Sequence, residues 1–233
     1  MFVIDLAGIP VEFDNRYAHI SEYCRGFETN KTPLLRIKVS SNEINAYLSS
    51  VAYPAGVEQA ERVLAYRKAC AKLTEYGVFL LHGAIISYCG RGIAFIADRG
   101  VGKTTHAKLW KDAFDEDVKF VNGDKPLIKK EGSEYFAYDT PWRGKEGLGG
   151  QKKVPLSAIC FIGRAQNPFA VRIGAAEALN YISHQIIYPE NENIYDSFSQ
   201  TIADFLKCTP AFAARVNMDK SSAIYLRDTI FNI

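Results

Sequence analysis

The octapeptide Ala-Asp-Arg-Gly-Val-Gly-Lys-Thr at residues 97–104 constrains this chain more than any other segment. It has the spacing of a phosphate-binding loop, with Ala97 where a glycine is usual. The glycines let backbone N–H groups turn toward phosphates, Lys103 can reach the β and γ oxygens, and Thr104 can offer a hydroxyl to Mg²⁺. The loop predicts a site for ATP with Mg²⁺, and the alternative is a Gly-rich turn in an unrelated α/β domain. The residues expected to hold the nucleotide are Asp98, Arg99, Gly100, Val101, Gly102, Lys103, Thr104 and Thr105.

The segments on either side of the loop support this interpretation. Residues 93–96 form an apolar run typical of a buried strand, and residues 103–114 have helical spacing. A second apolar run at 80–88 is predicted to be one strand, and only residues 89–92 separate it from the next. Four residues are too few for a parallel crossover, so we expect a β-hairpin that leads into the loop.

A carboxylate follows soon after the predicted helix. Residues 118–121 are expected to form a strand, and Asn122-Gly123-Asp124 ends it. One helix and one strand would return Asp124 to the phosphate loop, where it could hold Mg²⁺ or accept a proton from an attacking hydroxyl. The alternative is that these residues only make a turn before Pro126.

Three segments resemble the catalytic domain of the HPr serine kinase/phosphorylase family, and more closely its shorter HPr-kinase-like members. They are LLHGAIIS (80–87), GIAFIADRGVGKTTHAKL (92–109) and FVNGDKPLI (120–128). The resemblance covers about residues 78–163. It implies a phosphoenolpyruvate-carboxykinase-like α/β fold with mixed sheets and a hairpin before the loop, and transfer of the γ-phosphate of ATP to a serine hydroxyl.

The chain also departs from that family. Gly123 stands where the family has the first residue of an Asp-Asp pair, which leaves Asp124 alone as base and metal ligand. The family's Glu-x-Arg-Gly motif is represented by residues 141–144, which keep Arg143 but lack the Glu. Asp139, two residues before this segment, could take the place of that Glu. The later Gly-Arg-Asn motif is missing, so phosphorylation of HPr itself is not expected.

Residues 139–153, called the basic loop here, are rich in glycine, lysine and arginine. Such a loop could close over a triphosphate, with Arg143 stabilising the transferring phosphoryl group and Trp142 anchoring it, or it could be a solvated linker. His82 is either a core histidine or a group that faces the metal site and relays the proton of the acceptor hydroxyl. His106 is expected at the surface.

Composition excludes several classes of partner. The net charge of +2 predicts no strong field for nucleic acid or an anionic membrane. Five cysteines without a C-x-x-C pair fit reduced thiols, with Cys89 exposed, and no segment has the apolar length of a membrane span or the pattern of a signal peptide. We therefore expect a soluble cytoplasmic protein.

We expect one domain over residues 1–233, with a strand-rich layer at 1–57 and a nucleotide-binding core at 78–163. The other expected elements are strands at 2–4, 10–13, 34–39, 156–162, 169–173 and 211–216, and helices at 58–76, 175–187, 193–208 and 221–230. The expected function is a kinase that phosphorylates a hydroxyl of a protein, peptide or metabolite. The alternatives are a non-catalytic nucleotide-binding regulator and a small-metabolite kinase. The resemblance also suggests a homo-oligomer.

Overall fold

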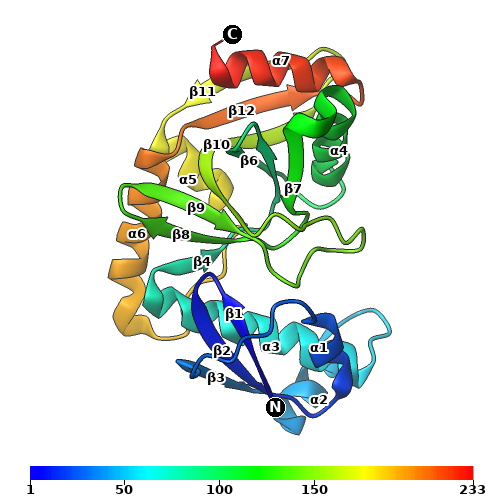
Figure 1. The fold of residues 1–233 in the computed structure, drawn as a ribbon, viewed down its shortest axis with the longest axis vertical. Helices are drawn as coiled ribbons and strands as arrows, with labels where there is room; N and C mark the ends of the chain where they lie inside the picture. The colour runs from blue at the N-terminus through cyan, green and yellow to red at the C-terminus, as the bar shows by residue number, and fades with distance from the viewer. Residues whose placement is uncertain (233) are drawn as a thin grey trace.

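The computed structural model describes residues 1–232. Its N-terminal unit, residues 2–73, places a three-stranded sheet beside three helices (Figure 1). Strands β1 and β2 form an antiparallel hairpin, and β2 pairs in parallel with β3. The elements are β1 (Phe2–Leu6), β2 (Ile9–Asp14), α1 (Ala18–Tyr23), β3 (Leu35–Lys38), α2 (Ser41–Ser50) and α3 (Val57–Leu73).

The three strands predicted in the first 57 residues are present, but α1 and α2 were not predicted there. Helix α2 carries a capping box, in which the Ser40 side chain accepts from the Glu43 N–H and the Glu43 side chain accepts from the Ser40 N–H. The helix predicted over 58–76 is an α-helix only as far as Leu73. It continues as the 3₁₀ turn η1 (Thr74–Tyr76) and stops at Gly77, whose φ of 67° is left-handed.

The rest of the chain forms a large mixed sheet. The longest strand, β10, pairs antiparallel with β9 at its start and in parallel with β6 and β12 further along, so it joins two parts of the sheet (Figure 1). The order is β4-β8-β9-β10-β6-β5-β7, and β11 pairs with β12. The bounds are β4 (Val78–Leu80), β5 (Ala84–Tyr88), β6 (Arg91–Ile96), β7 (Val118–Asn122), β8 (Leu127–Glu131), β9 (Glu134–Tyr138), β10 (Lys153–Arg164), β11 (Phe169–Ile173) and β12 (Ala211–Val216).

The predicted hairpin is confirmed, because β5 and β6 pair antiparallel and the exposed Cys89 opens the turn with a positive φ of 47°. The single strand predicted over 80–88 is wrong. Leu81, His82 and Gly83 separate β4, which pairs with β8, from β5, which pairs with β6 and β7. The backbone N–H of His82 binds the carbonyl of Gln185 instead of a neighbouring strand, at 2.7 Å. A Cβ at Gly83 would lie 2.9 Å from the Phe95 carbonyl, so glycine is needed at this break.

Helices cover both faces of the sheet around β10. Alternate residues of β10 point to opposite faces: Ile159 and Phe161 pack with α5 and α6, whereas Ala158 and Cys160 pack with α4 and α7.

The predicted helix 175–187 stops at Ile182, and Ile186 instead forms a bridge to Leu81. The bounds are α4 (Lys103–Phe114), η2 (Asp115–Asp117), α5 (Ala175–Ile182), η3 (Glu192–Ile194), α6 (Tyr195–Cys208) and α7 (Lys220–Phe231).

A third hydrophobic core joins the N-terminal unit to the large sheet. Trp142 of the basic loop, Leu80 of β4 and Leu127 of β8 pack into the core of the first three strands and α3. The start of β8 and the basic loop therefore lie against the N-terminal unit. Among residues 1–232, no helix combines the length and apolar character required to cross a membrane.

Candidate functional site

The predicted phosphate loop lies in the expected strand–loop–helix order, because β6 ends at Ile96 and α4 begins at Lys103. Gly100 and Gly102 have φ angles of 85° and 120°, a backbone region that favours glycine. Gly102 is the N-cap of α4 and no side chain caps the helix. The N–H groups of the first helical turn have no acceptor within the helix, so they are available to an anion.

Lys103 lies folded over this loop. Its Nζ donates to the carbonyls of Ala97 at 2.7 Å and Asp98 at 3.4 Å. Burial lowers the pKa of Lys103, and the negative charges of Asp124 and Asp98 oppose that shift.

Asp124 follows β7 in a turn that Asn122 organises. The Oδ1 atom of Asn122 accepts from the N–H groups of Asp124 at 2.9 Å and of Lys125 at 2.8 Å. The carboxylate of Asp124 then has two side-chain partners: His82 Nε2 is 3.2 Å from Oδ1, and the Lys125 ammonium binds Oδ2. Burial alone would raise the pKa of Asp124, but the hydrogen bonds from His82 and Lys125 hold it below its ordinary value.

His82 faces this carboxylate because of the chain break described above. Its side chain is 36% exposed, and the N–H of the following Gly83 donates to the carbonyl of Asp124 at 3.0 Å. Of the two interpretations left open by the sequence, the structure supports a histidine directed at the acidic residue.

Asp139 and Arg143 lie at the start of the basic loop and contact each other. The carboxylate of Asp139 accepts from Asn122 Nδ2 at 3.0 Å, from the Thr140 N–H at 2.8 Å and from the Gly150 N–H at 3.1 Å. It also forms an ion pair with Arg143, whose Nε is 3.1 Å from Oδ1. These bonds give Asp139 a positioning role, because it ties both ends of the loop to β7.

The geometry does not bring Arg143 to the phosphate loop. Its guanidinium pairs with Asp139, lies 5.4 Å from the ring centre of Phe27, and lines a different cavity from the one that contains Asp124. Other parts of the basic loop do approach the candidate site. A Cβ at Gly144 would lie 3.0 Å from Cβ of Asp124, and Glu146 forms an ion pair with Lys108 of α4.

The surface position predicted for His106 is wrong. This side chain is 2% exposed because its face of α4 packs against β6. The imidazole stands edge-on to Phe95 at 4.9 Å and accepts from the indole N–H of Trp110 at 3.2 Å. Burial lowers the pKa of His106 to about 4, so it is a neutral core residue.

Three residues of the site were not predicted. Arg164, at the end of β10, donates to the carbonyls of Gly100 at 2.6 Å and Val101 at 3.0 Å. Lys125 binds Asp124, and Asn122 connects Asp124 to Asp139. Asn122 and Lys125 adjoin residues that the motif singled out, whereas no local signal marks Arg164, which reaches the loop only through the pairing of β10 with β6.

No protein-family model and no curated protein sequence matches this chain. Among solved structures, the Hpr(Ser) kinase/phosphatase from Coxiella burnetii is similar to this chain with a TM-score of 0.41 and 9% sequence identity. The match covers 66% of this chain and 88% of that chain.

Proposed function

We propose that this protein is a kinase that binds ATP with Mg²⁺ at the phosphate loop and transfers the γ-phosphate to a hydroxyl. The observation that carries the proposal is the uncapped N-terminus of α4, which begins with the folded Lys103, together with the position of Asp124. The backbone carbonyl of Asp124 accepts from the N–H of Gly83, and Gly83 lies against the end of β6 that leads into the loop. The loop supplies donors for phosphate, and Asp124 supplies a base or a metal ligand.

The donor set fits Mg²⁺ held together with a nucleotide. Among the described residues, no group of three or more His, Cys, Asp and Glu side chains is arranged to hold a metal ion. Mg²⁺ in phosphotransfer sites uses one or two protein oxygens together with phosphates and water, which matches the Thr104 hydroxyl and the Asp124 carboxylate. When bound there, Mg²⁺ would neutralise charge on the phosphate oxygens.

Each residue has a defined task in this proposal. Lys103 leaves the carbonyls of Ala97 and Asp98 and binds the phosphates, while the N–H groups of the first turn of α4 hold their oxygens. Asp124, kept ionised by its neighbours, accepts the proton of the acceptor hydroxyl. His82 orients that carboxylate through its hydrogen bond.

The test is a parallel measurement of Mg²⁺-dependent ATP binding and of phosphate release by the purified protein. Lys103→Ala should abolish binding. Asp124→Asn should keep the ATP dissociation constant within about threefold and lower turnover by roughly 100-fold or more, the usual contribution of a general base. Lys111→Ala is the matched control, since Lys111 lies near the far end of the same helix and pairs with Asp115.

One observation also favours a regulator without chemistry: both oxygens of Asp124 already have side-chain partners in the protein. Such a regulator would bind ATP tightly in a Lys103-dependent manner, with no turnover for Asp124→Asn to reduce. Absence of ATP binding by the wild-type chain would contradict both proposals. A metabolite kinase and a protein kinase are distinguished only by the acceptor.

A further inference from the structure

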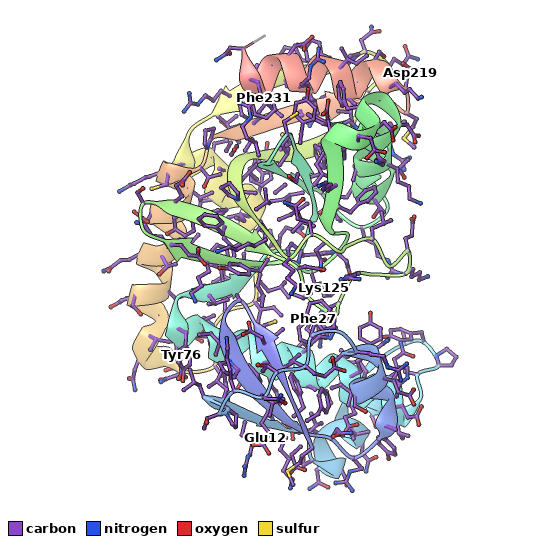
Figure 2. All side chains as sticks on the ribbon, in the orientation of Figure 1. Glu12, Phe27, Tyr76, Lys125, Asp219 and Phe231 are labelled. Carbon is purple, nitrogen blue, oxygen red and sulfur yellow. The ribbon has the colours of Figure 1, made fainter. Side chains whose placement is uncertain are left out.

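A cavity of about 440 Å³ lies between the N-terminal unit and the candidate site. Helices α1 and α3 supply Tyr23, Arg62, Val63 and Tyr66, and the opposite wall consists of Asp124, Lys125, Trp142, Gly144 and Lys145. Figure 2 shows Lys125 at the junction of the N-terminal unit with the large sheet. The cavity therefore reaches the carboxylate proposed as the base, and its volume lies in the range of small-molecule sites.

The walls combine cationic and aromatic side chains. The guanidinium of Arg62 stacks on Tyr23 at 4.2 Å from the ring centre, a contact that leaves its N–H edge available for a carboxylate. The ring of Tyr66 lies 5.4 Å from Trp142, and the ammonium of Lys125 lies 5.7 Å from Tyr66. Trp142 also carries a buried indole N–H without an acceptor among the residues that the structure describes.

Charge in the cavity is unbalanced. Asp124 is its one acidic lining residue, and Lys125 and His82 already pair with that carboxylate. Within residues 1–232, Arg62 and Lys145 form no ion pair, although both line the cavity. A ligand with a negative group would supply the missing partner for these two cations.

We propose that this cavity is the acceptor site and that the acceptor carries a carboxylate beside its hydroxyl, with Arg62 binding the carboxylate and Asp124 facing the hydroxyl. The inference rests on the proposed function. In the transfer, the acceptor oxygen forms a bond to the γ-phosphorus while the bond between that phosphorus and the β–γ bridging oxygen breaks. ADP leaves with the electron pair, and the hydroxyl proton goes to Asp124.

The proposal gives the N-terminal unit a role in binding the acceptor. Arg62 lies on α3, outside the segment that carries the phosphate loop, and the aromatic residues beside it come from α1 and α3. Specificity for the acceptor would thus reside in the N-terminal unit, and the phosphotransfer groups in the large sheet.

The test uses a matched pair of probes, N-benzoyl-L-serine and its neutral amide, titrated into the full chain by calorimetry. We expect the acid to bind roughly 10- to 100-fold more tightly than the amide, the factor for one hydrogen bond to a charged group. Arg62→Gln should weaken binding of the acid to the level of the amide. Arg67→Gln is the control, because Arg67 is on the same helix, is exposed and does not line the cavity.

A third probe is a peptide with an internal serine followed by glutamate. Tighter binding of this peptide than of N-benzoyl-L-serine indicates a polypeptide acceptor, and the reverse order indicates a small acid. Equal affinity for acid and amide, or no effect of Arg62→Gln on the acid, overturns the proposal. No saturable binding of the acid or the peptide up to millimolar concentration also overturns it. Lys103→Ala keeps the two proposals separate: it should lose ATP and still bind the acid.

Discussion

His82 lies 3.2 Å from Asp124, measured from its Nε2 atom to Oδ1, although the two residues come from different segments of the sheet. The contact depends on the break between β4 and β5, where Gly83 approaches the Phe95 carbonyl and its N–H binds the carbonyl of Asp124. The break therefore joins the backbone turn of Asp124 to a side chain that keeps its carboxylate ionised.

Replacement of His82 by Ala, which has no hydrogen-bond donor, should lower turnover by roughly 10- to 100-fold, the usual effect of losing a partner that orients a functional carboxylate. The acidic limb of the pH–rate profile should also move to higher pH, because the pKa of Asp124 rises without the hydrogen bond from His82. The measurement is kcat against pH, with ATP affinity as the check on folding. An acidic limb that does not move would exclude this positioning role.

The strand–loop–helix order and the β5–β6 hairpin could be predicted because each depends on nearby residues. Glycine spacing, an apolar run and a short connection specify them without knowledge of the rest of the chain. The position of Asp124 after β7 was predictable for the same reason.

The remaining features depend on contacts between distant segments. Residues 80–88 are mostly apolar, so their pattern does not reveal that His82 leaves the strand. That change comes from the bond of its N–H to the Gln185 carbonyl and from the approach of Gly83 to β6. His106 has a polar side chain, which favoured a surface position. Its helical spacing nevertheless puts it on one face with Ala107 and Trp110, and that face of α4 is buried against Phe95. The cavity beside α3 is formed in part by Trp142, a residue distant in the sequence that packs into the N-terminal core.

Replacement of Arg164 by Gln should weaken ATP binding by roughly threefold to tenfold, the effect of losing hydrogen bonds to a partly exposed loop. Arg164 donates to the carbonyls of Gly100 and Val101, so its loss leaves the loop less ordered before ATP binds. Calorimetry of ATP binding tests this. Arg172→Gln, at an exposed position of β11, should have no effect. Equal affinities for the Arg164 and Arg172 variants would contradict the prediction.

Replacement of Asp139 by Ala should lower the free energy of unfolding by about 3 kcal/mol. This value is the lower end of the range for breaking a buried ion pair, and it applies because the Arg143 side chain is 30% exposed. Asp139→Asn should cost less, since its carbonyl can still accept from Asn122 or from the Gly150 N–H. Urea unfolding measures both. The control is Glu131, which pairs with Lys153 at the surface, and Glu131→Ala should cost less than about 1 kcal/mol. A similar small cost for Asp139→Ala would remove its proposed positioning role.

The buried His106 predicts a specific dependence of stability on pH. Its pKa falls from 6.5 to about 4 on folding, so the folded chain holds it neutral while the unfolded chain takes up a proton as the pH drops. Its contribution is therefore complete above pH 6.5 and declines between pH 6.5 and about 4, with a maximum loss of about 3 kcal/mol.

The free energy of unfolding in urea should accordingly fall from pH 7 to pH 4.5 in the wild-type chain. His106→Gln keeps an acceptor for the Trp110 indole N–H but does not titrate, so it should have a smaller slope over the same interval. His184→Gln, at an exposed position, is the matched control and should keep the slope of the wild type. If His106→Gln also kept the wild-type slope, the decline in the free energy of unfolding would come from other titrating groups. Burial of a neutral His106 against Phe95 would then not limit the stability of this fold in acid.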